Sequence, residues 1–453
     1  MPAAERGRPR LLLVTYYFPP SGGAGVQRTL KFTKYLRAAG VEPVVLTVEA
    51  GAYPSLDPSL AADVPPGVRV VRTRALDPFG LYGALTGRSR RDAVAVGSIE
   101  TDSAAQRAAL WLRANVFLPD ARVGWVPFAA RAARRLARAG EVDAVLTSGP
   151  PHSTHLVGLR LQRELRRRGL PWIADFRDPW TGINFAGELP MTAAARALDA
   201  RLERRVLRAA DAVVTVSPTW ARELEAKGGL GPGAVRVIEN GFDPDDFPPD
   251  DVPPGGAAPG EGGAGGTFEL THVGSLYGSR DPAALWQAAA ALRARGEADG
   301  LRIRLVGRVD EAARASLRRY GLGDVVREDG VVSHAEAVRA MRRAGLLFLS
   351  IEPVANAAGI LTGKLYEYLA SGRPVLALGP PDGDAARLLR RVGAGSVVAW
   401  GDAEAVEGRL AEALGAWRRG EALAGASPEA LRAVSRPAQA ETLAELALGL
   451  MGE

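Results

Sequence analysis

The sequence predicts an α/β protein made of two Rossmann-like halves, each built on a parallel sheet. Apolar runs typical of buried strands alternate with stretches of helical periodicity, which indicates βαβ units. With 453 residues, the chain exceeds the size that one hydrophobic core usually supports, so we expect two cores. A segment of Pro, Gly, Ala and acidic residues at 248–266 separates the halves, and this composition cannot build a core.

Thirteen strands are expected along the chain. In the first half, the runs start at Leu11, Pro43, Val68, Asp143, Trp172, Asp211 and Val235. In the second half, they start at Phe268, Leu301, Val325, Leu346, Pro374 and Ser396. Helical stretches lie between most of them. Ser217 and Pro218 form a typical pair of N-cap and first helical residue. One last helix is predicted from about Pro428 to Leu450.

The segment GILTGKLYEYLASGRPVLAL, from Gly359 to Leu378, is the most informative part of the sequence. It belongs to a β-loop-α-β unit, and its helix starts at the carboxyl end of a strand, where open α/β sheets bind ligands. Such a helix start favours phosphate, and Lys364 adds a positive charge for a diphosphate. Glu367, on the same face, can accept hydrogen bonds from a diol such as a ribose. A solvated Lys–Glu pair is the alternative interpretation.

This helix resembles the donor site of glycosyltransferase family 4, in which a Lys and a Glu stand three residues apart. Three further segments are similar to family motifs and follow the family order: TYYFPPSGGAGVQR from Thr15, VIENGFD from Val237 and HVGSLYGSRDP from His272. The resemblance covers nearly the whole chain. One position departs from it, because the family usually has a second Glu where this chain has Gly359.

The resemblance implies the GT-B fold: two Rossmann-like domains with parallel sheets that face each other across a cleft, and a C-terminal helix that crosses back to the first domain. We expect an acceptor-side domain at residues 1–247, a linker or insertion at 248–266, a nucleotide-sugar-binding domain at 267–426 and the crossover helix at 427–453.

The same resemblance implies a retaining transfer of sugar from a nucleotide-diphosphate sugar. The acceptor would be a glycan, a lipid-linked molecule or a small molecule, as in polysaccharide or other glycoconjugate biosynthesis. A sugar-nucleotide epimerase of the same fold is one alternative. An inactive partner subunit is another, and Gly359 is the main argument for it.

Two loops of the first half are expected to face the ligands. The glycines of Ser21–Gly25 let the backbone approach an anion, and the resemblance assigns Gly22 and Gly23 to the donor diphosphate. A plain strand-to-helix turn is the alternative. The resemblance places His152 against the transferred sugar, whereas His155 is expected to support packing. A buried structural histidine is the alternative for either one.

The segment ADFRDPW ends another strand of the first half and supplies the acceptor-binding candidates Asp175, Arg177 and Asp178. Asp178 is the best candidate for accepting the hydroxyl proton of the acceptor. A turn that forms only a structural salt bridge is the alternative, because Arg-Asp-Pro segments often do so.

The second half supplies the remaining donor-binding candidates. Gly274 and Arg280 follow its first strand, and the Arg280 guanidinium would pair with diphosphate oxygens. The resemblance places Val331 and Val332 where related proteins hold the base by backbone contacts. In place of the missing Glu, the sugar would be held by the backbone amides of Gly359, Ile360 and Leu361. The predicted catalytic set is His152, Asp178, Arg280 and Lys364.

Composition excludes several classes of chemistry. The chain has no Cys, which excludes disulfides, thiolate catalysis and Cys-based metal sites. Its four His form no metal-binding motif, so we expect no metal and no cofactor beyond the donor. No apolar run approaches the roughly 20 residues that span a bilayer, and LLLV after the first arginines is a strand and no signal peptide. We expect a cytoplasmic enzyme, or one attached peripherally to the inner face of the membrane.

Positive charge is concentrated in the first half. Residues 1–247 contain 34 Lys and Arg against 25 Asp and Glu, whereas the remaining residues contain 23 against 26. Arg-rich helical stretches such as RAARRLAR from Arg131 and RLQRELRRR from Arg160 predict a surface that binds anionic lipid headgroups. General Arg usage in a GC-rich or heat-adapted proteome is the alternative. No nucleic-acid-binding motif is present, so we expect no nucleic-acid partner.

Overall fold

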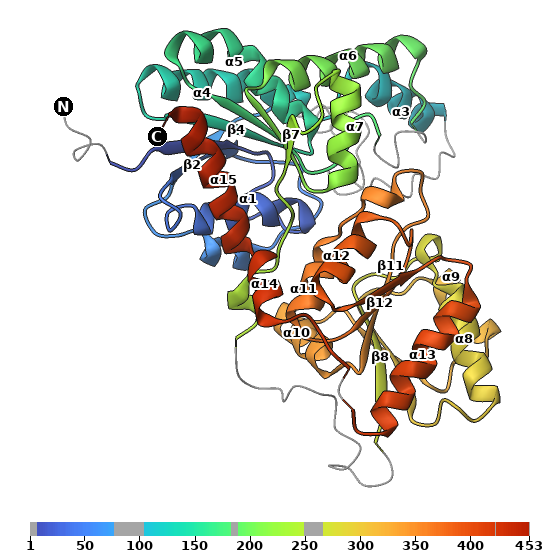
Figure 1. The fold of residues 1–453 in the computed structure, drawn as a ribbon. Coiled ribbons are helices and arrows are strands. Elements are labelled where there is room, and N and C mark those ends of the chain that lie inside the picture. The colour runs from blue at the N-terminus through green and yellow to red at the C-terminus, as the bar shows by residue number, and fades with distance from the viewer. Residues whose placement is uncertain (1–6, 77–103, 183–188, 249–265, 422, 453) are drawn as a thin grey trace. The chain divides into compact units, whose positions relative to one another are not determined.

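The computed structural model describes residues 7–76, 104–182, 189–248, 266–421 and 423–452 (Figure 1). The chain divides into two compact units. The first consists of Met1–Glu239 and Arg436–Glu453, and the second of Asn240–Ser435. Most of the predicted linker, residues 249–265, lies outside the described residues. Within the described part, none of the helices combines the length and apolarity needed to cross a bilayer.

The first unit is built on a seven-stranded parallel sheet in the order β3-β2-β1-β4-β5-β6-β7. All seven predicted strands are confirmed. They are β1 Arg10–Val14, β2 Glu42–Val48, β3 Arg69–Thr73, β4 Ala144–Gly149, β5 Trp172–Phe176, β6 Ala212–Thr215 and β7 Val235–Val237. In the central pair, Val14 lies opposite Thr147. The central strands are apolar along their length because helices cover both faces of the sheet.

Alternate residues of β1 point into two different cores. Leu11 and Leu13 pack with α1 Ala24–Tyr35 and α15 Arg436–Met451, whereas Leu12 and Val14 pack on the opposite face. That opposite face is covered by α4 Val126–Arg138, α5 His155–Arg168, α6 Ala193–Ala209 and α7 Pro218–Gly228, with α3 Ala104–Val116 beside α6. The predicted cap is confirmed, since the Ser217 side chain accepts a hydrogen bond from the Trp220 amide.

The second unit is built on a six-stranded parallel sheet in the order β10-β9-β8-β11-β12-β13. The six predicted strands are confirmed as β8 Phe268–Val273, β9 Leu301–Val306, β10 Val326–Gly330, β11 Leu346–Ser350, β12 Val375–Leu378 and β13 Gly395–Val398. The helices are α8 Ala283–Ala294, α9 Glu311–Arg319, α10 His334–Arg343, α11 Gly363–Ala370, α12 Asp384–Val392, α13 Ala403–Arg418 and α14 Pro428–Ala433.

The prediction of one uninterrupted last helix was wrong. The chain leaves α14 after Ala433, and Ser435 then forms an isolated parallel bridge with Phe242 before α15 begins at Arg436. Pro437 is the second residue of α15, where the missing amide hydrogen costs nothing. Because α15 packs against α1, the predicted return of the C-terminal helix to the first domain is confirmed.

Each sheet has one point where the strand order reverses. This point lies between β1 and β4 in the first sheet and between β8 and β11 in the second. Loops diverge from the carboxyl ends of the strands at such a point, and open α/β sheets bind their ligands there. The loops after β1 and β4 contain the Gly-rich segment and His152, while those after β8 and β11 contain Gly274 and lead to Lys364. Topology therefore selects the same loops as the sequence motifs.

Candidate functional site

Lys364 and Gly274 are brought into direct contact in the second unit. Lys364 lies in the first turn of α11, and Gly274 follows β8. A Cβ atom at Gly274 would stand 1.9 Å from Lys364 Nζ, and the φ of Gly274 is +122°, which favours glycine. Only a residue without a side chain therefore leaves room for the lysine at this position.

A second cation lies close to Lys364. Burial lowers the pKa of Lys364, and the charge of Arg280 lowers it further, whereas Glu367 raises it. Arg280 belongs to the short helix η7 Gly278–Arg280, and its Nη2 lies 2.9 Å from Glu352 Oε2. The Arg280 Nε is buried and makes no hydrogen bond. Two partly buried cations that repel each other form a site suited to an anion with more than one charge, such as a diphosphate.

Three residues that the sequence analysis did not select complete this part of the site. Glu352, just after β11, holds Arg280. Tyr368 is buried, and its hydroxyl oxygen accepts a hydrogen bond of 2.8 Å from the Val273 amide, which fixes α11 against the end of β8. His272 Nδ1 lies 3.1 Å from the Phe348 carbonyl oxygen and must donate to it. Burial lowers the pKa of His272 to about 4, so it is neutral at pH 7 and adds no third positive charge.

The other donor-binding candidates of the second unit lie on the loop before α11 or near it. Glu367 is half-buried one turn after Lys364, and Leu361 is buried just before α11. The amides of Gly359 and Ile360 donate to the carbonyls of Asn356 and Ala357. Two of the three amides predicted to hold the sugar are therefore already engaged within the loop. Val331 is exposed and Val332 is half-buried after β10.

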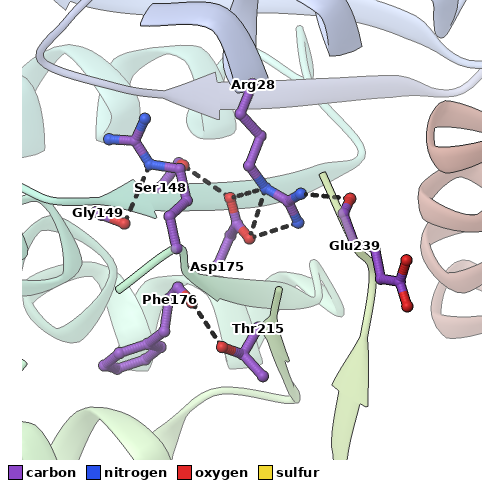
Figure 2. Close-up of polar contacts among 8 residues, drawn as sticks. Arg28, Ser148, Gly149, Asp175, Phe176, Thr215 and Glu239 are labelled. Carbon is purple, nitrogen blue, oxygen red and sulfur yellow. Dashed lines mark hydrogen bonds and ion pairs between the residues drawn. The ribbon is translucent and has the colours of Figure 1, made fainter. Parts of the chain in front are cut away.

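A buried ion pair in the first unit joins Arg28 of α1 to Asp175 of β5 (Figure 2). Arg28 of α1 contacts both carboxylate oxygens of Asp175, with Nη2 3.0 Å from Oδ1, and its Nη1 donates to the Glu239 carbonyl at 2.9 Å. Ser148 Oγ donates to Asp175 Oδ2 at 2.7 Å. Arg28 is 2% exposed and Asp175 0%, so the carboxylate of Asp175 is occupied by partners within the fold, and its part in acceptor binding stays a prediction. Arg28 was not among the predicted site residues, because it stands between the polar residues Gln27 and Thr29 and nothing in the local sequence marks it as buried.

Arg177 connects three backbone segments of the first unit. It is 7% exposed, and its guanidinium donates to the backbone carbonyls of Gly25, Gly149 and Pro150. Gly25 lies in the first turn of α1, Gly149 is the last residue of β4 and Pro150 follows it, and Arg177 itself follows β5. The Arg177 side chain therefore holds these backbone segments together at the edge of the sheet where the parallel strands end. Next to it, burial raises the pKa of Asp178, while the Arg177 charge lowers it. A carboxylate with a raised pKa is suited to accept a proton.

His152 and His155 form a buried aromatic stack with Phe176 and Trp180. The His152 ring lies 5.4 Å from the Trp180 ring and nearly parallel to it. Neither ring nitrogen of His152 makes a hydrogen bond of standard geometry, and burial, with the charges of His155 and Arg177, holds its pKa well below 6.5. His155 begins α5, its Nδ1 lies 3.0 Å from Thr147 Oγ1 and its ring stacks on Phe176. His155 therefore packs as expected, and His152 is neutral at pH 7.

Among the described residues, no group of three or more His, Asp or Glu is placed to hold a metal ion. Metal independence remains a prediction.

Comparisons with known proteins agree with this geometry. Residues 88–246 match the family model described as Glycosyltransferase Family 4. No curated protein matches the chain. Three solved structures share its fold over nearly their whole length: a sucrose-phosphate synthase from Thermosynechococcus elongatus, HepE from Anabaena in complex with UDP and glucose, and a putative UDP-N-acetylglucosamine 2-epimerase from Listeria monocytogenes.

Sequence identity to these structures is low. The synthase is 18% identical with a TM-score of 0.63, and the match covers 98% of this chain and 100% of the synthase. HepE is 16% identical with a TM-score of 0.55 and coverage of 96% and 98%. The epimerase is 12% identical with a TM-score of 0.53 and coverage of 99% and 98%. These likenesses confirm the predicted GT-B fold, and the fold alone accommodates both sugar transfer and epimerisation.

Proposed function

We propose that this chain is a glycosyltransferase that transfers a sugar from a nucleotide-diphosphate sugar to an acceptor, and the match of residues 88–246 to the family 4 model supports this. We propose further that the reaction retains the anomeric configuration and needs no metal ion. The second unit would bind the donor and the first unit the acceptor. An epimerase remains the second candidate because one solved structure of this fold has that description.

The observation that carries the proposal is the position of Lys364 in the space left by Gly274, beside Arg280. Negative charge builds up on the departing nucleoside diphosphate as the glycosidic bond breaks, so it is greater in the transition state than in the ground state. Fixed cations at this point stabilise the transition state more than the ground state, which is the requirement for catalysis. Lys364 and Arg280 would supply that charge, and Glu352 would orient Arg280.

HepE, which shares this fold, was solved with UDP and glucose, and this supports a nucleotide-sugar donor for the present chain. On the first unit, Asp178 would accept the proton of the acceptor hydroxyl, because its raised pKa favours proton uptake. His152 is neutral and would act as a hydrogen-bonding group towards the sugar. A cytoplasmic or peripheral membrane location and a role in glycoconjugate biosynthesis belong to the same proposal.

Donor binding followed by product analysis tests the proposal. UDP-, GDP- and ADP-sugars are screened for an increase in the melting temperature, and the donor that stabilises the protein is then incubated with it alone or with candidate acceptors. Transfer to an acceptor, lost in Lys364→Met, is the expected result. An epimerised sugar nucleotide formed without acceptor would favour the epimerase. Binding without turnover under any condition would favour an inactive partner subunit.

A further inference from the structure

One face of the first unit is unusually rich in arginine. Helices α4, α5 and α6 lie side by side on the side of the sheet opposite to α1 and α15 (Figure 1). Together they contain fourteen arginines: Arg131, Arg134, Arg135, Arg138, Arg160, Arg163, Arg166, Arg167, Arg168, Arg196, Arg201, Arg204, Arg205 and Arg208. Thirteen of these are exposed and Arg134 is half-buried. We call their side chains the arginine face.

Few carboxylates neutralise this face. The three helices contain only Glu164, Asp199 and Glu203, and the last two are buried, where they accept hydrogen bonds from Trp180 and Thr181. Among the described residues, Arg138 and Arg168 are the members of the arginine face that form ion pairs, and both use Glu164. The face therefore has a large uncompensated positive charge.

General Arg usage alone does not account for this pattern, because ion pairs are more frequent in the second unit, where at least ten of the 21 arginines are paired with carboxylates, than on this face. In the second unit, exposed or half-buried arginines meet carboxylates, as in Arg293–Asp324, Arg295–Glu407, Arg314–Glu328 and Arg419–Glu421. On the opposite side of the first sheet, Lys31 and Lys34 of α1 share Asp63, and Arg28 is paired with Asp175. Interaction with the helix dipole explains arginines in the last turns, but Arg131, Arg163 and Arg201 lie away from the helix ends.

Exposed apolar residues lie at one end of this face. Trp111, Leu112 and Val116 of α3 are 48%, 47% and 58% exposed, and Leu198 of α6 is 49% exposed. The two helices are joined by the Asn115 side chain, which donates to the Pro190 carbonyl and accepts from the Thr192 amide. Tryptophan favours the interface between headgroups and acyl chains, and leucine and valine favour the apolar layer below it.

We propose that the arginine face and this apolar rim dock the first unit on an anionic membrane surface. Arginines would contact lipid phosphates, and the rim would insert at the level of the acyl carbonyls. The combination favours a bilayer over nucleic acid, because duplex grooves offer no apolar layer for exposed Trp, Leu and Val side chains. The rim also lies near the candidate acceptor side, since Asp120, which follows α3, accepts hydrogen bonds from Ser153 beside His152. That a lipid-linked acceptor is presented in this way rests on the proposed function.

The test uses the full-length protein in flotation with vesicles of phosphatidylcholine alone or with added phosphatidylglycerol. The variant R131Q/R135Q/R163Q/R167Q removes four exposed charges of the arginine face. The variant R314Q/R318Q/R409Q/R419Q removes four charges from the second unit and is the matched control for net charge. We expect the first variant to bind anionic vesicles about 10²- to 10³-fold more weakly, since each interfacial arginine contributes roughly fivefold. The control should bind almost as well as the wild type.

Vesicle binding measured at low and at high salt separates the contribution of the apolar rim from that of the arginine charges. Trp111→Ser combined with Leu198→Ser should weaken binding at high and low salt alike, whereas the effect of the arginine substitutions should shrink as salt is added. An equal loss of vesicle binding in both quadruple variants would show that the arginine face is not the docking surface. So would absence of flotation by the wild type at low salt. Tighter binding to duplex DNA than to vesicles, lost in the same arginine variant, would identify nucleic acid as the partner instead.

Sugar transfer is measured separately, with a water-soluble acceptor in detergent solution. The arginine variant should keep wild-type turnover there, because no substituted residue belongs to either candidate site. Vesicle binding without any turnover of the wild type would remove the proposed function and leave the docking surface intact. Turnover without vesicle binding would remove the docking surface and leave the proposed function intact.

Discussion

At the scale of single residues, the proposed donor site depends on a glycine that makes room for a lysine. Gly274→Ala introduces a methyl group that would stand 1.9 Å from Lys364 Nζ, at a φ that disfavours any side chain. We expect Lys364 to be displaced and turnover to fall by at least about tenfold, which corresponds to ~1.4 kcal/mol of transition-state stabilisation. The control is Gly323→Ala, where a Cβ atom meets nothing within 4 Å. Equal, unchanged kinetics in both variants would contradict the role of this contact.

Substitutions of Lys364 and of Glu367 should affect different steps of the reaction. Glu367→Ala removes an acceptor for the donor hydroxyls and should weaken donor binding by ~1.5–3 kcal/mol, the range of a hydrogen bond to a charged group. Lys364→Ala should mainly lower kcat, because the lysine charge matters most when the diphosphate leaves. Calorimetric titration with the donor and steady-state kinetics distinguish the two effects. Wild-type values in both variants would remove the pair from the mechanism.

Residues within one motif could be predicted from sequence, whereas partners far apart in the chain could not. Lys364 and Glu367 share one helix turn, so spacing alone places them together. Arg28 and Asp175 are 147 positions apart, and Arg280 and Glu352 are 72 apart. These pairs form only because the strand order brings the loops after β1, β4 and β5, or those after β8 and β11, to one edge. Nothing in the local sequence indicates which carboxylate an arginine will meet.

At the scale of elements, the pair Arg28–Asp175 joins α1 to β5. Loss of one partner leaves a buried charge uncompensated, so Arg28→Met or Asp175→Asn should each lower the free energy of unfolding by ~3–5 kcal/mol. The double variant should lose less than the sum of the two. Arg37→Met is the matched control, since its pair with Glu42 at the end of α1 is partly exposed and should contribute only ~0–1 kcal/mol.

Urea denaturation of the wild type and the four variants measures these differences. Additive losses in the double variant would show that Arg28 and Asp175 act independently, contrary to the hydrogen bonds between them. A loss in Arg37→Met as large as that in Arg28→Met would show that burial does not distinguish the pairs.

Helices and strands could be predicted from the sequence where burial on both faces favours one type of structure. Central parallel strands are covered on both faces, so runs such as LLLV and LLFLS leave little choice of structure. The break between α14 and α15 was missed because helical periodicity continues across it in the sequence. The bridge between Ser435 and Phe242 competes with the helix there, and it involves residues almost two hundred positions apart. Pro437 was the local signal for a new helix start.

At the scale of the whole molecule, the reaction should not depend on a metal ion. Fixed cations, Lys364 and Arg280, are present where a metal would otherwise neutralise the diphosphate. Turnover should therefore survive EDTA. Activity that disappears on chelation and returns with added Mg²⁺ or Mn²⁺ would contradict this mechanism.

The absent carboxylate at position 359 should loosen selection among donor sugars. A site that lacks a hydrogen-bonding carboxylate rejects an analogue without the matching hydroxyl only weakly. We expect larger differences between bases than between sugars that differ at one hydroxyl, measured as kcat/KM ratios across matched donors. A preference above ~10⁴ for one epimer would show that another side chain has taken over this role. The engaged amides of Gly359 and Ile360 make such a side chain more necessary.

The bonds of Arg177 have a consequence for how this molecule can diverge. Its guanidinium holds the start of α1 and the end of β4 through the backbone carbonyl oxygens of Gly25, Gly149 and Pro150, and every amino acid has such an oxygen. Neighbouring side chains of these segments can therefore be exchanged during evolution while the backbone path is preserved. A lineage could therefore acquire a new acceptor by altering side chains of these segments, provided that Arg177 is kept.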